Sequence, residues 1–322
     1  MSKDGPIPIR MPAAVSLLPA RAAALHSARR RSSSRHSQPV GTPEAHSSNS
    51  SWLRLNGKVA VVTGGASGLG RAISLELALQ GVRVAVLDVQ PEDQGLQVVN
   101  MVTSSTGQHA MYAQVDIAAR ENTLPETIGR IASTLGRIDV LVNNAGINVP
   151  ALLVDEGGKH EVSDSVLDRV LAVNVKGVFR VTQAVVRHML ECGTTGGVVI
   201  NIASEAGSQG SAGQSVYAAS KGAVYAMTHS WAKEFKGSIR VMGVSPGVLE
   251  ATGLRTPAYE EALAYTRGQT VQQLRESYAK GILLGREARL GEVASVVAFL
   301  ASHRASYIDG TVLNVTGGKS WL

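Results

Sequence analysis

The sequence predicts a single doubly wound α/β domain built around a mainly parallel sheet of seven strands. Two observations carry this prediction. Short, continuous apolar runs alternate with longer segments that carry helix signals along most of the 322 residues, and strands that are apolar on both faces are typical of parallel sheets covered by helices. The chain also has 34 glycines and only 4% aromatic residues, which suits tight turns and closely packed helices.

The expected strands are short and mostly apolar. The first, Lys58–Thr63, reads Lys-Val-Ala-Val-Val-Thr, and the second ends at Asp88. In chain order the seven strands are 58–63, 82–88, 109–115, 138–142, 197–202, 238–244 and 311–315. Because helical segments separate them, we expect these strands to lie parallel and to be covered on both faces.

Helices are expected between the strands. The first follows a glycine-rich turn and stops at Gly81, which suits a left-handed C-terminal cap. The expected helices are 71–80, 92–105, 121–135, 164–190, 215–235 and 291–301. Neither a linker nor an internal repeat interrupts the alternation, so residues 51–322 are assigned to one domain. Within it, residues from about 247 to 285 are expected to form a lid over the substrate, because they follow the sixth strand.

The N-terminal segment differs from the rest of the chain. Residues 5–43 contain six arginines and no acidic residue, together with many Ser, Ala and Pro residues. No apolar face repeats in the segment, so residues 1–50 are expected to be a disordered basic extension. Three interpretations stay open: a start codon assigned too far upstream in a GC-rich genome, an organellar presequence, or a basic regulatory tail.

Charge and hydropathy exclude several classes of partner. The net charge is +6, but residues 1–50 hold seven basic and two acidic residues, which leaves the remaining body close to neutral. A nucleic-acid-binding surface is therefore not indicated. No apolar run is long enough for a transmembrane helix, and the single cysteine, Cys192, excludes an internal disulfide or a cysteine-based metal site. We expect no metal and a cytoplasmic protein, or an imported organellar one if the presequence is genuine.

The glycine-rich turn after the first strand predicts a dinucleotide site. Its sequence is Thr63-Gly-Gly-Ala-Ser-Gly-Leu-Gly70, and it opens a strand–helix–strand unit. Glycines let the backbone approach the pyrophosphate, and the free N–H groups at the start of the following helix favour its negative charge. The residues expected to contact the cofactor here are Thr63, Gly64, Ser67, Gly68, Leu69 and Gly70.

Asp88 predicts which dinucleotide binds. It ends the second strand, 18 residues after Gly70, where a carboxylate accepts hydrogen bonds from the adenosine ribose and repels a 2′-phosphate. Ala66 and Ser67 in the turn, and Val89 after the Asp, stand where a phosphate-binding cation would be found. The pattern favours NAD over NADP, with a solvated acid at a strand end as the alternative interpretation.

Two further strand ends carry candidate cofactor residues. Asp116 and Ile117 follow the third strand, and Asp116 either accepts from the adenine amino group or caps a turn. After the fourth strand comes Asn143-Asn144-Ala145-Gly146. Its amides can tie neighbouring strand ends together while the glycine makes room for the cofactor, so Asn144, Ala145 and Gly146 are candidates, with a purely structural role for the asparagines left open.

Four polar residues form the candidate catalytic group. Tyr217 and Lys221 are four residues apart in a helical stretch and so share a face. A lysine ammonium beside a phenol lowers the phenol's pKa, so that Tyr217 can exchange a proton near neutral pH. Ser204 follows the fifth strand and can hold the substrate oxygen. Asn174 lies in an otherwise apolar helical stretch, and a proton-relay water beside Lys221 would satisfy its amide if it is buried.

Taken together, these motifs resemble the short-chain dehydrogenase/reductase family over residues 55–318. The matching residues are Thr63–Gly70, Asn143–Gly146, Asn174, Ser204, Tyr217 and Lys221. The resemblance implies a Rossmann-type fold and an NAD-dependent oxidoreductase. It implies that Tyr217 is the general acid/base, that Lys221 lowers its pKa and holds the nicotinamide ribose, that Ser204 positions the substrate oxygen, and that Asn174 completes the relay. Tyr217 and Lys221 thus count among the cofactor-binding residues as well.

The resemblance has further implications. Pro246-Gly247 resembles the family's loop beneath the nicotinamide. The family usually has a threonine five residues after that proline, whereas here Ala251 occupies the position and Thr252 follows, which puts the threonine's contact in doubt. The family also implies a homotetramer joined through the helices near 164–190 and 215–235 and through the last strand.

The lid predicts a polar, anionic substrate. It carries Arg255, Arg267, Arg275 and Lys280 but few large apolar residues, although a solvent-facing helix would explain Arg267 and Arg275 equally well. Several segments are similar to the branch of the family that interconverts D-sorbitol 6-phosphate and D-fructose 6-phosphate with NAD. These segments are Asn201–Gly207, Gly247–Pro257, Tyr259–Tyr265, Thr270–Arg275 and Gly317–Lys319.

Substrate residues follow from that similarity. Arg255 is the first candidate for the phosphate, because its planar guanidinium suits bidentate contact; Lys280 and Arg286 come next, and Glu205 is a candidate acceptor for a sugar hydroxyl. The alternatives are a dehydrogenase of a free polyol such as sorbitol, a 3-oxoacyl reductase, an NAD-sensing regulator without turnover, and a nucleic-acid-binding role of the basic extension.

Overall fold

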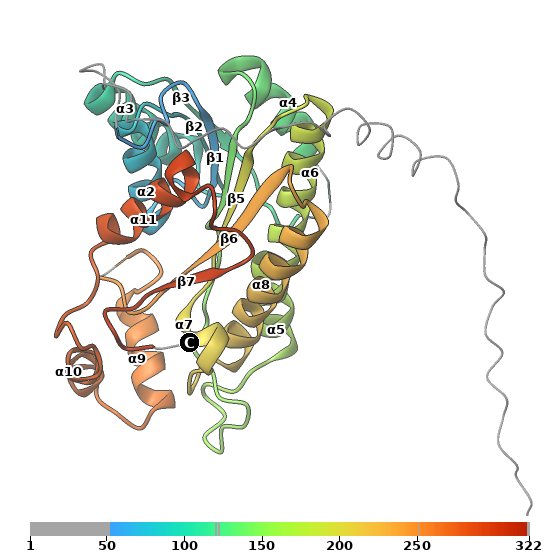
Figure 1. The fold of residues 1–322 in the computed structure, drawn as a ribbon. Helices are drawn as coiled ribbons and strands as arrows, with labels where there is room; N and C mark the ends of the chain where they lie inside the picture. The colour runs from blue at the N-terminus through green and yellow to red at the C-terminus, as the bar shows by residue number, and fades with distance from the viewer. Residues whose placement is uncertain (1–51, 120, 122, 251, 321–322) are drawn as a thin grey trace, which may run out of the picture. The chain divides into compact units, whose positions relative to one another are not determined.

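All seven expected strands form one parallel sheet in the computed structural model of the protein (Figure 1). The structure describes residues 52–119, 121, 123–250 and 252–320, so the expected extension 1–50 lies outside the described residues. The strand order is β3-β2-β1-β4-β5-β6-β7, and each neighbouring pair is parallel. The strands are β1 Val59–Thr63, β2 Arg83–Asp88, β3 Ala110–Gln114, β4 Val140–Asn143, β5 Gly197–Ile202, β6 Ile239–Pro246 and β7 Val312–Val315.

Helices cover both faces of this sheet. Alternate strand residues point to opposite faces, so Ala60 and Val62 pack in one buried cluster with α2, α3 and α11, while Val59 and Val61 pack in another with α4, α6 and α8. Figure 1 shows α2 and α11 on one side of the sheet and α6 and α8 on the other. These helices are α2 Gly68–Leu79, α3 Glu92–Thr106, α4 Leu124–Leu135, α6 Val178–Glu191, α8 Ser215–Glu234 and α11 Leu290–Ala301.

The long helix expected over 164–190 contains an unexpected irregularity. It consists of α5 Asp164–Leu171, a π-helical stretch Ala172–Gly177 and α6. The wider turn falls on Asn174, whose buried amide bonds to the backbone of Ile147 and to Ser220. Single π turns are rare and often occur at functional sites.

The lid contains two helices that the sequence analysis did not predict. α9 spans Pro257–Thr266 and α10 spans Val271–Gly281, and a short helix, α7 Glu205–Gln209, lies at the same end of the domain (Figure 1). Their start signals are present in the sequence. Thr256 caps α9 ahead of Pro257, and Thr270 with Gln273 forms a capping box at the start of α10. In the described part of the chain, no helix combines the length and the apolarity needed to cross a membrane.

The sheet topology places a crevice beside the glycine turn. The strand order reverses between β1 and β4, and ligands of doubly wound folds bind outside the carboxyl ends of the strands at such a point. Gly70 lets α2 approach this crevice, because a Cβ there would lie 2.0 Å from the carbonyl oxygen of Gly64. Gly81, after α2, has φ +88°, which confirms the left-handed cap.

Two glycine substitutions should therefore have opposite effects on stability. We predict that Gly70→Ala lowers the free energy of unfolding by about 1–3 kcal/mol or more, because backbone must move to admit the methyl group. Gly129→Ala serves as the matched control, since nothing lies within 4 Å of its Cβ position in α4; it should raise stability by about 0.5–1 kcal/mol. Urea unfolding measures both, and an unchanged midpoint for Gly70→Ala would contradict the tight turn.

Candidate active site

A cavity of about 470 Å³ lies at the crevice between β1 and β4. All but two of the residues expected to hold the cofactor line it, from Gly64 in the turn to Gly247 after β6. The exceptions are Thr63 and Gly70, which lie in the glycine-rich turn but do not line the cavity. Thr63 Oγ1 accepts hydrogen bonds from the backbone N–H groups of Asn144 and Ala145, at 3.0 and 3.1 Å. Both residues therefore act on the cofactor site through the backbone that they position.

The glycine turn fits a pyrophosphate. Gly64 and Gly68 have φ values of +62° and +48°, a conformation that glycine adopts without strain. Helix α2 begins directly after Ser67, whose side chain makes no capping hydrogen bond, and its first turn holds no acidic residue. Its first N–H groups are thus available to an anion, and no carboxylate in that turn opposes one.

Asp88 and Asp116 line the same cavity, and each is also bound to nearby backbone. Asp88 is 8% exposed; its Oδ2 accepts from the N–H of Ala66 at 2.9 Å and its Oδ1 from Gln90 at 3.1 Å. Asp116 Oδ1 accepts from the N–H of Ala118 at 2.8 Å, so its role in a turn is confirmed. Each carboxylate oxygen retains a second lone pair for a ligand.

Side-chain amides join the strand ends, as the sequence predicts. Asn143 Nδ2 donates to Asn201 Oδ1 on β5 and to Thr182 Oγ1 on α6, both at 2.8 Å. Asn144 Nδ2 donates to the carbonyl oxygens of Thr63 and Gly64, at 3.0 and 3.1 Å. β4 is thereby tied to β5 on one side and to the glycine turn on the other.

Ser204, Tyr217 and Lys221 meet where the cavity passes the ends of β5 and α8. The Ser204 hydroxyl hydrogen-bonds the phenol of Tyr217. Lys221 Nζ donates to the carbonyl oxygen of Ile202 at 2.7 Å and lies 5.8 Å from the centre of the Tyr217 ring. A Cβ on Gly146 would lie 3.5 Å from Lys221 Nζ, so glycine keeps the wall open beside the lysine.

Asn174 finds its partners within the protein. Its Oδ1 accepts from the N–H of Ile147 at 2.8 Å, and its Nδ2 donates to the Ile147 carbonyl at 2.9 Å and to Ser220 Oγ at 3.0 Å. The relay water expected from the sequence is therefore not needed to satisfy this buried amide. The structure gives Asn174 a positioning role, because it links the segment after β4 to the helix that carries Tyr217 and Lys221.

Burial sets the pKa values of the catalytic pair. Burial raises the pKa of Tyr217, the hydrogen bond from Ser204 opposes that rise, and the charge of Glu205 adds to it. Burial also lowers the pKa of Lys221 to about 8. We expected Lys221 to lower the pKa of the Tyr217 phenol. In the protein without cofactor that expectation is wrong, because burial penalises the charged form of both groups.

A second cavity, of about 300 Å³, adjoins the first and shares six lining residues with it: Ser204, Tyr217, Gly247, Leu249, Thr252 and Leu254. Fifteen of its twenty-two lining residues carry polar side chains. Two of these residues, Glu205 and Asn148, have a buried acceptor oxygen with no hydrogen-bond partner in the described structure. Buried acceptors are normally paired, so this wall suits a ligand that carries several hydroxyl donors.

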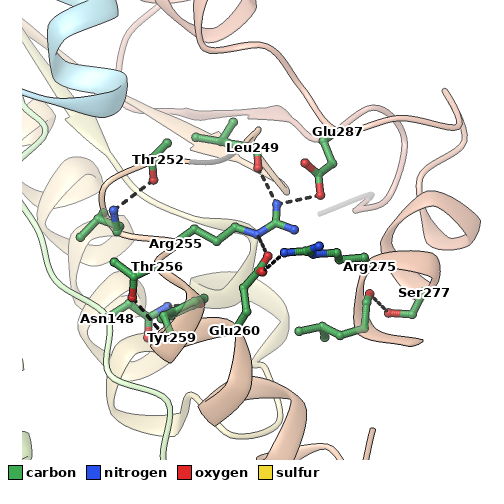
Figure 2. A network of polar contacts seen from close by, with 12 residues as sticks. Asn148, Leu249, Thr252, Arg255, Thr256, Tyr259, Glu260, Arg275, Ser277 and Glu287 are labelled. Carbon is green, nitrogen blue, oxygen red and sulfur yellow. Dashed lines mark hydrogen bonds and ion pairs between the residues drawn. The ribbon is translucent and has the colours of Figure 1, made fainter. Parts of the chain in front are cut away.

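Arg255 lines this cavity, but other side chains hold its guanidinium (Figure 2). Its Nε contacts Glu260 at 2.7 Å, and its Nη1 contacts Glu287 at 2.7 Å and the carbonyl oxygen of Leu249 at 3.0 Å. Glu260 also pairs with Arg275. Two carboxylates thus compensate the charge of Arg255. This arginine joins segments of the lid to one another, and its compensated charge makes it a weak candidate for binding the phosphate.

The other two cations expected at the phosphate lie elsewhere. Lys280 is exposed on α10, and Arg286 forms an exposed ion pair with Glu292; neither lines the cavity. The described structure therefore gives no support to these two assignments. Glu205 lies in the wall, where one carboxylate oxygen pairs with Lys319.

The structure adds cavity residues that sequence reasoning did not select. Arg267 at the end of α9 and Lys319 near the C-terminus line the wall, together with Asn148, Gln214 and Tyr259. Gln214 and Asn148 both donate to the Tyr259 hydroxyl, at 2.7 and 3.1 Å. The polar, basic composition of the lid and the similarity of the segments around 259–275 and 317–319 pointed to this region, but neither selected these residues.

Thr252 also lies at the cofactor cavity. A Cβ on Gly68 would lie 3.3 Å from the Thr252 Cβ, so the start of the lid packs against the glycine turn. Ala251, where the family usually has threonine, is outside the described residues.

Comparisons with known proteins agree with this geometry. The family model for short chain dehydrogenases matches residues 58–262. A sorbitol-6-phosphate 2-dehydrogenase from Klebsiella pneumoniae is 46% identical over 84% of this chain and 98% of its own length. A 3-oxoacyl-[acyl-carrier-protein] reductase from Thermotoga maritima is 39% identical over 83% of this chain and 99% of its own.

Solved structures of related proteins share the fold of this chain. The crystal structure of an NAD+-bound xylitol dehydrogenase is 30% identical, with a TM-score of 0.75, and the match covers 82% of this chain and 100% of that one. An actinorhodin polyketide ketoreductase with NADPH is 29% identical, with a TM-score of 0.74, over 82% of this chain and 98% of that one. Both nicotinamide dinucleotides therefore occur among the structural relatives.

The lowered pKa of Lys221 predicts a pH-dependent stability. Between about pH 8 and about pH 10 the unfolded chain keeps the lysine proton that the folded chain has lost, so unfolding becomes less favourable as the pH rises. The stability of the wild type relative to Lys221→Met should therefore rise across this window by up to about 1.4 kcal/mol per pH unit and be constant below it. Urea unfolding of both proteins measures the difference; a constant difference at all pH values would mean that Lys221 stays charged.

Proposed function

The chain belongs to the short-chain dehydrogenase family, and we propose that it interconverts D-sorbitol 6-phosphate and D-fructose 6-phosphate with NAD. The observation that carries this proposal is the polar cavity beside Ser204 and Tyr217. Its volume, about 300 Å³, lies at the lower end of the range for small-molecule sites. Such a cavity suits a short polyol phosphate better than a long acyl chain.

The unpaired acceptors strengthen this choice of substrate. The free oxygens on Glu205 and Asn148 can accept hydrogen bonds from the hydroxyl groups of a polyol, whereas an acyl chain offers no donor to them. The similarity to the Klebsiella pneumoniae protein points to the same chemistry.

The chain's own residues manage the proton and the orientation of the substrate. NAD+, when bound, supplies the hydride acceptor, and its positive charge favours a phenolate nearby. Tyr217 takes the proton of the reacting hydroxyl group, which Ser204 holds beside the phenol. Lys221, anchored on the Ile202 carbonyl, keeps a cationic group next to Tyr217 when it is protonated. Glu205 opposes phenolate formation, and its ion pair with Lys319 moderates that effect.

NAD is proposed as the cofactor because of Asp88. Its carboxylate is held at the cavity wall by Ala66 and Gln90, where a 2′-phosphate would meet negative charge. The described cavity residues near it are Ser67, Leu87, Val89 and Gln90, and none of these is cationic.

Two other reactions deserve a direct comparison. A free polyol such as sorbitol fits the hydroxyl-binding wall, and the 39% identity to a 3-oxoacyl reductase supports reduction of an acyl thioester. An NAD-sensing regulator is disfavoured, because Tyr217 and Lys221 are both present and placed together. The homotetramer stays a prediction from the family resemblance.

One assay compares these possibilities. The full chain is supplied with NAD+ and sorbitol 6-phosphate, sorbitol or mannitol 1-phosphate, and with NADH or NADPH and a 3-oxoacyl thioester, while NADH or NADPH absorbance is followed. We expect the largest kcat/KM with sorbitol 6-phosphate. A larger value with sorbitol or with the thioester would refute the proposed substrate while leaving the family assignment intact.

A charge change at Asp88 tests the cofactor. Asp88→Asn keeps an acceptor oxygen but removes the negative charge, so kcat/KM for NAD+ should fall about 10-fold or more while that for NADP+ rises. Asp116→Asn is the matched control, because Asp116 lines the same cavity but is exposed; it should change the NAD+ to NADP+ preference little. Steady-state kinetics with both cofactors measure the ratio, and an unchanged ratio in Asp88→Asn would mean that Asp88 does not select NAD.

A further inference from the structure

We propose that Arg267, together with the hydroxyl groups of Ser211 and Tyr278, binds the phosphate group of the substrate. This inference rests on the proposed polyol-phosphate function and names the part of the cavity that distinguishes a phosphorylated polyol from a free one. All three residues line the polar cavity that contains Ser204 and Tyr217.

The first argument is the state of the cations in the wall. Three cationic residues line the cavity in the described part of the chain: Arg255, Arg267 and Lys319. Arg255 is compensated by Glu260 and Glu287, and Lys319 is compensated by Glu205. No ion pair joins Arg267 to a carboxylate among the described residues, so its charge is available to an anionic ligand.

The second argument is the surroundings of the Arg267 guanidinium. Its Nη2 donates to Ser211 Oγ at 3.0 Å and to Gln214 Oε1 at 3.4 Å, and its Nε donates to the carbonyl oxygen of Ala212 at 3.3 Å. It also lies close enough to the Tyr278 hydroxyl to oppose the rise in that group's pKa that burial causes, and Tyr278 lines the same cavity. All these partners are neutral. They fix the orientation of the guanidinium without cancelling its charge, as an anion site requires.

The third argument is that tight packing holds this residue in place. Arg267 is the C-terminal cap of α9, and the preceding residue, Thr266, packs against Gly213. A Cβ on Gly213, which has φ +74°, would lie 2.0 Å from Thr266 Oγ1. The end of α9 is therefore pressed against the loop that carries Ser211, and Arg267 meets its partners with little freedom to move.

The composition of the site suits a phosphate. A phosphate monoester offers several acceptor oxygens and at least one negative charge, and Arg267 and Tyr278 offer a cation and a hydroxyl donor. The Ser211 hydroxyl donates to Gln214 Oε1 at 2.6 Å, and it would exchange this partner for a phosphate oxygen when the substrate binds. Two carboxylates, Glu205 and Glu250, share the cavity. Lys319 pairs with Glu205, and Glu250 accepts a hydrogen bond from the N–H of Leu290 at 2.7 Å. The cavity thus separates a hydroxyl-binding part, next to Ser204, from an anion-binding part around Arg267.

The test compares Arg267→Gln with Lys280→Gln as a matched control. Lys280 is a cation of the same lid, exposed and outside the cavity, so its replacement removes the same charge from the lid. Each protein is assayed with NAD+ and either sorbitol 6-phosphate or sorbitol. We expect Arg267→Gln to lower kcat/KM for sorbitol 6-phosphate about 10- to 100-fold, mainly through KM, with a much smaller loss on sorbitol. Lys280→Gln should keep the wild-type ratio.

Two additional measurements keep the result interpretable. Arg267→Lys retains the positive charge but not the planar, bidentate guanidinium, so its preference for the phosphorylated substrate should lie between those of Arg267→Gln and the wild type. If Arg267→Gln fails to fold, Arg267→Lys takes its place in the comparison. Inorganic phosphate should inhibit the oxidation of sorbitol 6-phosphate competitively in the wild type and much less in Arg267→Gln.

The outcomes separate this inference from the proposed function. If the wild type prefers sorbitol 6-phosphate and Arg267→Gln keeps that preference, or loses equally on both substrates, the phosphate site is refuted while the function stands. If the wild type itself shows no preference for the phosphorylated polyol, the proposed function and this site are both refuted.

Discussion

Hydrogen bonds made by side-chain amides hold the carboxyl ends of β1, β4 and β5 together, and both halves of the candidate active site depend on them. Asn144 ties β4 to the glycine turn, and Asn143 ties it to Asn201 on β5, which in turn reaches Thr228 on α8 at 2.9 Å. The turn that receives the dinucleotide and the helix that carries Tyr217 and Lys221 are thereby held in one frame. Because the amides of Asn143 and Asn201 are buried, losing one partner would leave the other unsatisfied at a cost of about 1–3 kcal/mol.

Tyr217 and Lys221 belong to this frame, and the lid lines much of the polar cavity beside them. Burial raises the pKa of Tyr217 and lowers that of Lys221, so it favours the neutral form of both side chains. Tyr217 therefore needs a nearby positive charge to become a phenolate that can accept a proton. The lid contributes differently. Arg255, Glu260 and Glu287 cancel one another's charge and fasten the lid, which leaves Arg267 uncompensated in the wall. The two arginines therefore differ. The charge of Arg255 is compensated within the lid, whereas the charge of Arg267 is available to a ligand.

The fold and the cofactor site follow from sequence because their signals are local. Apolar runs such as Val59–Thr63 and the turn ending at Gly70 determine their own conformation, and the candidate residues Ser204, Tyr217 and Lys221 follow from spacing within the family pattern. The π-helical turn at Asn174 could not be predicted in this way, because it depends on contacts with Ile147 and Ser220, which are distant in sequence. The sequence could not show that Arg255 is ion-paired while Arg267, among the described residues, is not, for a similar reason. Whether an arginine is free depends on which carboxylates fold beside it, and Glu287 lies 32 residues from Arg255.

Transfer of hydrogen from C2 of the substrate is the central claim, and isotope labelling tests it most directly. Sorbitol 6-phosphate deuterated at C2 is oxidised with NAD+, and both products are analysed by mass spectrometry. The account predicts that the deuterium appears in the reduced cofactor, that the fructose 6-phosphate is unlabelled, and that kcat/KM is lower than with unlabelled substrate. Unlabelled NADH together with a sugar phosphate that retains its deuterium would contradict the account, because hydride would then have left another carbon.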